Sequence, residues 1–412
     1  MSLRNWAGNV TFTPDEVTAP TSIDEVADVV ARSRRVRALG TGHSFSPIAD
    51  SEVLLSLASV PRVVDVDSTS ATARVSAATR WGEIAPDLHA HGLAVHTTGS
   101  LPHISVAGSV ATGTHGYGDA NGCLATAVVG LEVVTSDGSL REIHRGEPDF
   151  DGSVVALGSL GIVTHVTLAC VASYDVAQTV WDGMPWTAAL EGFDEVMGSA
   201  QSVSLFTTWR GAGFEQVWVK QRIGDTEPDL GWAGARRADG PRHPVPGADP
   251  VHCTQQGGVP GPWFERVPHF RLDFTPSSGQ ELQTEYLVPR EHAADALRAV
   301  DGVRDVVAPV LQISEIRTVA ADDLWLSPAY GRDSVAIHFT WVADTARVLP
   351  AVAAVEAALG PYGPRPHWGK VFTMSPSLVA AAYPRMPDAR RLVDERDPDG
   401  RFRNDFVDTY LR

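Results

Sequence analysis

Basic residues and cysteines are scarce in this sequence of 412 residues, and it has no long hydrophobic run. The 33 Lys and Arg stand against 50 Asp and Glu, and a net charge of −17 disfavours binding to nucleic acid and to anionic membranes. No apolar run approaches the roughly 20 residues of a membrane span, and the first residues lack the layout of a signal peptide. Cys123, Cys170 and Cys253 have no metal-ligand spacing and imply no disulfide framework. We therefore expect a cytoplasmic protein with no metal, nucleic-acid or membrane partner.

The length of the chain and a change in its pattern of helix and strand signals predict two domains of an α+β protein. Residues 1–172 alternate between strand and helix signals, beginning with a capping box at Ser22–Glu25. Residues 173–376 hold strands such as Ser202–Trp209, whose alternating pattern predicts one covered and one open face. We expect residues 377–412 to return to the first domain and complete it.

A histidine lies in a glycine-rich loop directly after a short predicted strand, Val36–Leu39. The loop Gly40–Phe45 reads Gly-Thr-Gly-His-Ser-Phe and carries His43 at its tip. Glycines let the backbone approach a ligand closely, and their N–H groups can point at phosphate oxygens. A nucleophilic imidazole at this place suits a covalently held cofactor, whereas a tight turn with an exposed histidine is the plainer alternative.

Two further stretches of small residues strengthen the case for a cofactor site. Ser100–Gly116 is almost free of large or charged side chains, so main chain can pack against a flat or extended ligand there. Thr112, Thr114 and the local backbone N–H groups can serve a pyrophosphate. Gly158–Val163 offers another close approach. The spacing is not that of the Rossmann fingerprint. Structural glycines explain any one of these stretches, but three in one domain favour a cofactor site.

Two predicted strands of the second domain place polar side chains on one face. Glu315 and Arg317 are two residues apart, as are His338 and Thr340, and large apolar residues alternate with both pairs. Such a surface suits a ligand made of hydroxyl groups, which needs a donor and an acceptor at each carbon. A half-exposed sheet with a solvated polar face explains the same periodicity, and Lys370 fits an ordinary surface position equally well.

The whole chain resembles the alditol oxidases, flavoenzymes of the vanillyl-alcohol-oxidase (PCMH-type) fold in the aldonolactone-oxidase branch. The segments that carry this resemblance are Gly40–Phe45, Ser100–Gly116, Gly158–Val163, Glu315–Arg317, His338–Trp341, His367–Lys370 and Asp397–Phe402. The resemblance implies a two-domain fold in which an FAD-binding domain is paired with an α+β substrate-binding cap domain.

The resemblance also assigns roles to individual positions. His43 matches the histidine bonded to the 8α-methyl of FAD, and Ser100–Gly108 lacks the cysteine that forms a second link in some relatives, so one covalent link is expected. Matching FAD contacts are Ala38, Leu39, Gly40, Thr41, Gly42, Ser44, Ser100, Ser105, Gly108, Thr112, Gly113, Thr114, His115, Val163 and His367. Positions that surround the polyol are Ser100, Glu315, Arg317, His338, Thr340 and Lys370.

The activity implied is oxidation of the terminal CH2OH of acyclic polyols such as xylitol and sorbitol. Hydride passes to flavin N5, and O2 is reduced to hydrogen peroxide. We expect the protein to be a monomer. Arg317 and Lys370 are the cations expected to stabilise developing negative charge, with Glu315 orienting the arginine or accepting from a substrate hydroxyl. The general base is undecided. A sugar-1,4-lactone oxidase or dehydrogenase of the same fold and a non-catalytic carbohydrate-binding protein are the alternatives.

Overall fold

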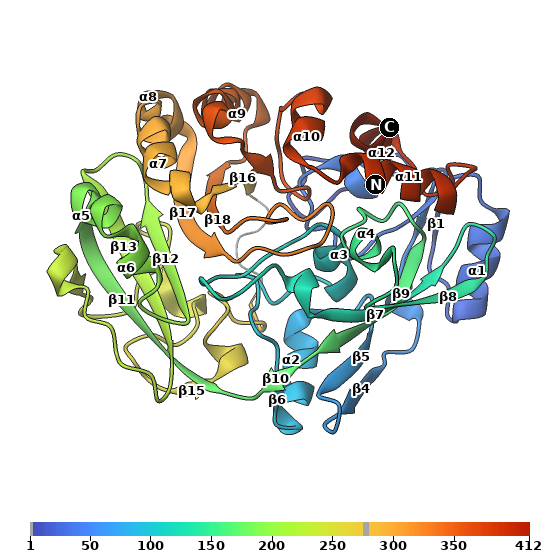
Figure 1. The fold of residues 1–412 in the computed structure, drawn as a ribbon, viewed down its shortest axis with the longest axis horizontal. Helices are drawn as coiled ribbons and strands as arrows, with labels where there is room; N and C mark the ends of the chain where they lie inside the picture. The colour runs from blue at the N-terminus through green and yellow to red at the C-terminus, as the bar shows by residue number, and fades with distance from the viewer. Residues whose placement is uncertain (1–2, 275–279) are drawn as a thin grey trace.

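The computed structural model describes residues 3–274 and 280–412 of the chain. Its ribbon has two halves side by side, one built on a large sheet and one on two smaller sheets (Figure 1). No helix within the described ranges is both long and apolar enough to cross a membrane.

The half that holds the N-terminus contains two main sheets. The first is parallel, with strand order β1-β3-β2, and the second is antiparallel, with order β4-β5-β9-β7-β8. Their strands are β1 (Glu16–Thr18), β2 (Val36–Ala38), β3 (Val53–Leu55), β4 (Val64–Asp67), β5 (Thr72–Ser76), β7 (Val128–Val134), β8 (Leu140–His144) and β9 (Ile162–Ala169). A short pair joins β6 (Leu93–Ala94) to β10 (Val171–Ala172).

The other half is organised on a nine-stranded sheet with order β14-β11-β13-β12-β17-β18-β16-β19 and β15 beside β11. Its strands are β11 (Asp175–Pro185), β12 (Ser202–Thr207), β13 (Gly213–Arg222), β14 (Arg236–Arg237), β15 (Gly261–Pro262), β16 (Glu281–Pro289), β17 (Leu311–Val319), β18 (Ser334–Val342) and β19 (Arg365–Pro366). All six residues of β12 are buried, so the prediction of one open face on this strand was wrong. Strands on both sides and a covered second face explain the difference.

Helices cover both halves. The first half carries α1 (Ile23–Arg32), α2 (Trp81–Ala90), α3 (Val106–Ala111), α4 (Phe150–Val154), α10 (Pro376–Ala382), α11 (Met386–Arg396) and α12 (Asp405–Leu411). Over the large sheet lie α5 (Trp186–Glu191), α6 (Phe193–Met197), α7 (Ala293–Asp301), α8 (Arg304–Val307) and α9 (Thr345–Leu359) (Figure 1). At the start of α1, Ser22 accepts from the N–H of Glu25 as the capping box predicts, but the Glu25 carboxylate accepts from Thr21 instead.

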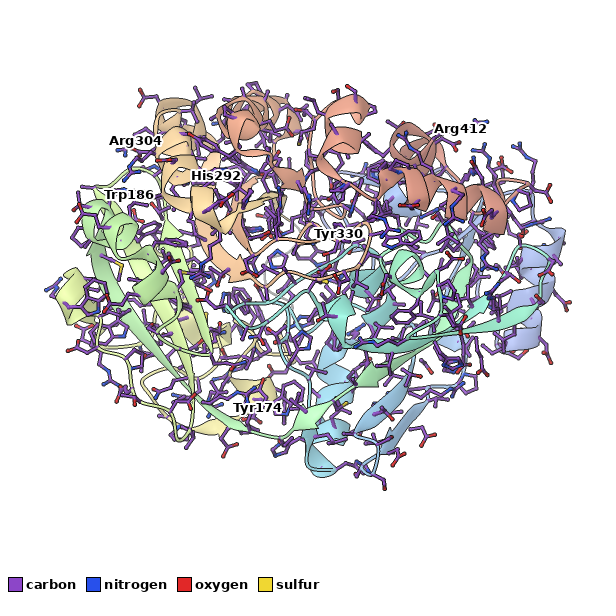
Figure 2. All side chains as sticks on the ribbon, viewed as in Figure 1. Tyr174, Trp186, His292, Arg304, Tyr330 and Arg412 are labelled. Carbon is purple, nitrogen blue, oxygen red and sulfur yellow. The ribbon has the colours of Figure 1, made fainter. Side chains whose placement is uncertain are left out.

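The chain crosses between the halves next to Tyr174, labelled at the lower edge of the molecule in Figure 2. Its hydroxyl donates to Val95 O at 3.2 Å, and the Arg222 guanidinium lies 3.9 Å from the ring centroid. The carbonyl of Tyr174 accepts from the N–H of Trp263. These contacts fix the crossing between residues of both halves.

The C-terminal tail packs against the first half. Val36 N–H donates to Arg401 O at 2.8 Å, which places the tail beside β2. The Asn404 side-chain amide lies 2.8–3.2 Å from the carbonyls of Pro47, Ile48 and Asp50. The predicted domain boundaries remain a prediction, although these contacts are those expected of a domain that the tail completes.

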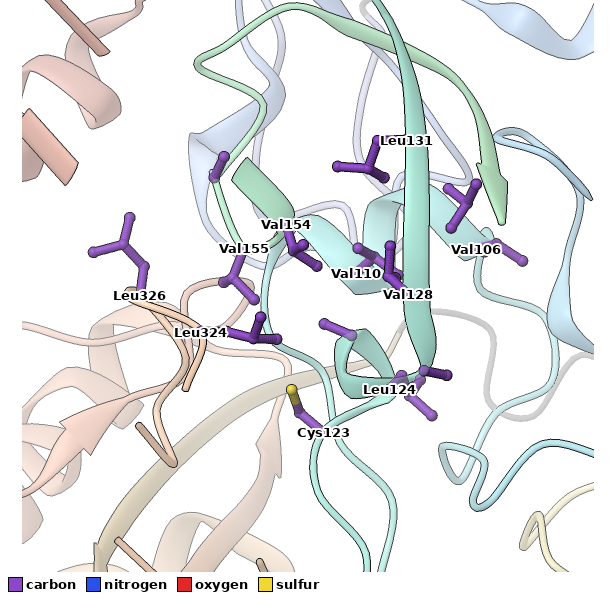
Figure 3. Packing of buried hydrophobic residues seen from close by; sticks show 14 of the residues in the cluster. Val106, Val110, Cys123, Leu124, Val128, Leu131, Val154, Val155, Leu324 and Leu326 are labelled. Carbon is purple, nitrogen blue, oxygen red and sulfur yellow. The ribbon is translucent and has the colours of Figure 1, made fainter. Parts of the chain in front are cut away.

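The core of the first half also takes in residues from the middle of the chain. Leu324 and Leu326 belong to the same buried cluster as Val154, Val155 and Val106 (Figure 3). Burial of these side chains joins the segment after β17 to α3 and α4. The two halves therefore share packing along the same seam on which the candidate site lies.

Candidate functional site

A cavity of about 660 Å³ lies between the two halves. Its walls come from the glycine-rich segments of the first half and from one face of the large sheet. Every site residue proposed from the sequence lines it except Gly113, which forms a turn with φ +63° and lies against Pro328. The sequence therefore located one site from segments more than 300 positions apart, although the individual roles stay predictions.

The His43 loop is held from two sides. Trp6 N–H donates to Gly42 O at 2.8 Å, and the Asn5 side chain donates to Ser44 O. On the opposite side, Phe45 N–H donates to Gly369 O at 2.7 Å. These bonds fix the loop between the chain start and the segment that carries His367 and Lys370.

The His43 imidazole lies against the Trp6 indole, with ring centroids 5.2 Å apart and planes 20° apart. Its Nδ1 is buried and has no hydrogen-bond partner among the described residues. Burial, reinforced by His103 and Arg80 and opposed by a backbone hydrogen bond with Thr41, lowers the pKa of His43 to about 4. The ring is therefore neutral near pH 7, with a lone pair free to form a bond.

The second small-residue segment contributes two hydroxyl groups near its end, where two backbone N–H groups are bonded within the protein. The Thr112 and Thr114 hydroxyls lie 3.0 Å apart and both residues line the cavity. The backbone N–H of Thr114 donates to Ser109 O, and that of Gly113 donates to Val110 O. Those two N–H groups are thus satisfied inside the protein, contrary to the expectation that the local backbone would serve a pyrophosphate.

Three neighbouring strands of the large sheet present one polar row to the cavity, and an aromatic residue of a fourth strand continues it. Glu285 of β16 pairs with His338 of β18, which pairs with Glu315 of β17, which pairs with Phe206 of β12. Side chains two residues away, such as Thr340 and Arg317, lie on the same face. The row is buried, so the alternative of a solvated polar sheet face was wrong.

Glu285 is the central anion of this face. Its carboxylate pairs with the Arg317 guanidinium, lies 2.9 Å from Lys370 Nζ, and lies 3.3 Å from His115 Nε2. Burial opposes its ionisation, but Arg317 and Lys370 hold the pKa of Glu285 well below its usual range. One buried carboxylate therefore contacts both cations predicted to stabilise the reacting oxygen, and Glu315 supplies a second negative charge near Arg317.

Lys370 also bonds to His338, and this contact fixes the tautomer of the histidine. Lys370 Nζ lies 2.7 Å from His338 Nδ1, and a lysine ammonium can only donate. Nδ1 is therefore the acceptor, and Nε2 carries the hydrogen that it donates to Thr340 Oγ1 at 3.1 Å. Burial and the Lys370 cation lower the pKa of His338 well below its usual range, so the ring is neutral.

Arg317 and Lys370 differ in their electrostatic surroundings. Burial opposes the charge of Arg317, but Glu285 and Glu315 raise its pKa above the ordinary value. Burial lowers the pKa of Lys370, with Glu285 opposing and Arg317 reinforcing the shift. Arg317 is thus a permanent cation, whereas Lys370 is the more readily deprotonated of the two.

Sequence reasoning missed Glu285, His269, Lys220 and Tyr117, all buried at this site. Glu285 follows Glu281 and Gln283 at the same two-residue spacing that revealed Glu315 and Arg317, so that signal was present. His269 lies in a loop without periodicity, which leaves no comparable signal.

Comparison with known proteins agrees with this geometry. The FAD binding domain family matches residues 14–144, and the D-arabinono-1,4-lactone oxidase family matches residues 278–410. An alditol oxidase from a Streptomyces species is 54% identical, over 98% of each chain. The chain belongs to the alditol oxidase family. L-gulono-1,4-lactone dehydrogenase from Mycobacterium tuberculosis is 28% identical over 98% of this chain and 97% of its own.

The fold of this alditol oxidase family member is also that of a solved flavoenzyme. Cholesterol oxidase from B. sterolicum superposes with a TM-score of 0.79 at 14% identity, covering 100% of this chain and 96% of the other. The two-domain vanillyl-alcohol-oxidase-type fold expected from the sequence is thereby confirmed. The protein is an FAD-binding oxidoreductase.

The residues of the cavity fit FAD. The buried Nδ1 of His43 has no hydrogen-bond partner among the described residues and can bond to a cofactor. Gly40, Gly42 and Gly108 place no side chain in the cavity. Arg317 Nε is also buried without a hydrogen-bond partner among the described residues. A flat cofactor against these walls, with the polar row of the sheet opposite it, accounts for the unsatisfied groups.

Proposed function

We propose that this protein oxidises the terminal CH2OH of acyclic polyols such as xylitol and sorbitol to the aldehyde, with O2 reduced to hydrogen peroxide. The observation that carries the proposal is the buried polar row formed by Glu285, His338 and Glu315, with Arg317 and Lys370 beside it. It offers fixed acceptors and donors for several hydroxyl groups at once, which an extended polyol can satisfy. The 54% identity to an alditol oxidase supports the same substrate class.

FAD, when bound, supplies the redox chemistry by accepting two electrons from the substrate carbon and passing them to O2. We assign the contacts with FAD to the segments 38–44 and 105–115 and to Val163 and His367, with His43 forming a single link to the 8α-methyl. Two properties of His43 support that link. It is neutral near pH 7, and its buried Nδ1 has no other partner in the described chain.

The protein's own residues bind the polyol and manage charge. Arg317 and Lys370 stabilise the substrate oxygen as its proton leaves, because both cations are held in a buried site where screening by water is weak. Glu315 accepts a hydrogen bond from one further substrate hydroxyl, and Thr340 donates one to another. Ser100, whose hydroxyl is bonded to Tyr117, lies at the same wall and completes the polyol subsite.

The experiment records the visible spectrum of the purified protein and then adds xylitol, sorbitol or L-gulono-1,4-lactone. It measures flavin bleaching without air and peroxide release in air. Bleaching by the polyols and stoichiometric peroxide support the proposal. Faster bleaching by the lactone than by the polyols favours a lactone oxidase. Bleaching that is not rapidly reversed by O2 favours a dehydrogenase. A colourless protein that none of these compounds changes favours a carbohydrate-binding role. Cytoplasmic localisation and a monomeric state stay predictions from the sequence.

A further inference from the structure

Beside Glu315 lies a further set of buried polar residues that the proposed reaction does not use. His269 Nε2 lies 2.8 Å from Glu315 Oε1, and His269 Nδ1 lies 2.9 Å from Lys220 Nζ. The side chains of Glu315, His269 and Lys220 are almost completely buried. The three groups form a continuous line along the cavity face of the large sheet, from β17 to β13.

The donors and acceptors along this line fix the tautomer of His269. The Glu315 carboxylate is ionised and can only accept, so His269 Nε2 carries the hydrogen. Nδ1 is then an acceptor and receives a hydrogen from Lys220. Lys220 also donates to Val267 O and to Pro268 O, the latter at 3.1 Å, so its three acceptors match the three N–H bonds of an ammonium.

The histidine is itself held in place from all sides. Its backbone N–H donates to Ser100 O at 3.1 Å, and its carbonyl accepts from Thr254 N–H at 2.9 Å. The Tyr117 ring lies 4.8 Å from the imidazole, centroid to centroid, and the Tyr117 hydroxyl bonds to Ser100. A histidine fixed in this way can hold a carboxylate in one orientation.

The other oxygen of Glu315 is left for the cavity. Oε2 lies 3.7 Å from Arg317 Nε, beyond hydrogen-bond distance, and has no hydrogen-bond partner within the part of the chain that the structure describes. Burial opposes ionisation of Glu315, but Arg317 and His269 hold the pKa of this carboxylate below its usual range. An ionised Oε2 that is paired in charge with Arg317 but accepts no hydrogen bond from the described residues is an acceptor available to a ligand.

We propose that His269, fixed by Lys220, is a positioning residue that orients Glu315 so that Oε2 accepts a hydroxyl of the polyol. This inference rests on the proposed function and extends it to two residues outside the cavity contacts expected for the family. The charged and titratable groups around the dyad are Arg317, Tyr117 and Glu285 near the cavity, His338 on β18, and Cys253 beside Lys220.

The test compares His269→Leu, which removes both bonds, with His269→Gln, whose amide can donate to Glu315 and accept from Lys220. We expect His269→Leu to raise the xylitol Kd about tenfold, measured by anaerobic flavin reduction, and His269→Gln to stay within about threefold of the parent protein. Lys220→Met, which removes the donor to Nδ1 while the bond from Nε2 to Glu315 stays, should show a smaller increase. Equal losses in His269→Leu and His269→Gln would overturn the proposal.

A pH profile separates positioning from a merely structural role. Without His269, burial should raise the pKa of Glu315, so the leucine variant should gain an acid limb in the ratio of reduction rate to Kd that the parent and glutamine variants lack. If this ratio depends on pH in the same way in the parent, leucine and glutamine proteins, His269 does not position Glu315.

A measurement on the unaltered holoenzyme keeps the proposal testable if the variants fold poorly. Burial lowers the pKa of Lys220 to about 7, so the ammonium bond to His269 is fully formed at about pH 6. Nitrogen NMR of histidine-labelled protein at that pH should show His269 with a protonated Nε2 and a bare Nδ1; the opposite tautomer would refute the dyad. Failure of xylitol to reduce the parent enzyme contradicts the proposed function instead, and the NMR result stands apart from it.

Discussion

The Trp6 indole covers the His43 imidazole at a centroid distance of 5.2 Å, so a residue near the start of the chain forms one wall of the covalent site proposed for FAD. The stack restricts rotation of the imidazole and excludes water from that side of the ring. Together with the neutral state of His43, it supports the single covalent link to FAD that we propose for this residue.

Replacement of His43 by Ala should leave FAD that is released by acid, because no other residue at this loop offers a nucleophilic nitrogen. The measurement is the visible spectrum of the pellet and the supernatant after acid precipitation. Trp6→Leu serves as the matched variant, since it removes the stack while the nucleophile stays, and its flavin should remain in the pellet. A yellow pellet from His43→Ala contradicts the assignment.

Lys370→Met and Thr340→Ala should affect different kinetic constants. Lys370 is a cation facing an oxygen that becomes negative only during the reaction, so its loss should slow flavin reduction by about 10²–10³. Thr340 offers a neutral hydroxyl contact in both states, so Thr340→Ala should mainly raise the xylitol Kd. Stopped-flow reduction over a range of xylitol concentrations separates the two constants.

The control for the lysine is its partner. Because Glu285 holds Lys370 in place, Glu285→Gln should also slow flavin reduction. If the flavin of Lys370→Met is reduced at the parental rate and only the xylitol Kd rises, the lysine is a substrate-binding group alone.

Acid should unfold the protein through Glu285 and Glu315. Each has a folded-state pKa below its ordinary value, so the unfolded chain binds more protons as pH falls, and the free energy of unfolding decreases below about pH 5. Glu285→Gln, which leaves two buried cations without their anion, should lose about 3–5 kcal/mol at pH 7. Its melting temperature should then fall less than that of the parent protein between pH 5 and pH 4. Parallel decreases in both proteins would exclude Glu285 as a source of the acid sensitivity.

Docking of the C-terminal tail can be separated from capping of its helix at Asn404. Asn404 Oδ1 accepts from Val407 N–H and caps α12, while its Nδ2 lies against three carbonyls of the segment 47–50. Asn404→Asp keeps the cap and removes the donors, so we expect a loss of about 1–3 kcal/mol and weaker retention of FAD. Thr409→Ala on the exposed side of α12 is the control and should be near neutral. An unchanged melting temperature in Asn404→Asp, measured by circular dichroism, would indicate that the tail is not needed to complete the domain.

Sequence periodicity predicted which residues share a strand face but not how deeply that face is buried. The pairs Glu315–Arg317 and His338–Thr340 lie on one side as expected, because a strand fixes the direction of alternate side chains. Whether water or another domain covers that side depends on how the chain folds back on itself. A local pattern carries no information about that, so the solvated and ligand-binding interpretations could not be separated from the residues alone.

The partners of the charged residues were also beyond the sequence. Glu285 joins Lys370 across 85 positions, and His269 joins Glu315 across 46. Such pairings arise from strand order and loop path, which place β16 beside β18 and bring His269 against the cavity face of β17. The His43 loop, by contrast, was readable because its glycines and its histidine are contiguous.

Arg37 shows a consequence of building the cofactor wall from both ends of the chain. Its buried guanidinium, at the end of β2 that leads to the His43 loop, donates to the carbonyls of Leu157 and Phe402. Phe402 is synthesised 365 residues after Arg37. A nascent chain can therefore form the helices and strands of its first half on the ribosome. The hydrogen bond from Arg37 to Phe402 O, at the base of the His43 loop, cannot form until residue 402 has been synthesised. We therefore expect FAD to be bound late in the maturation of the protein.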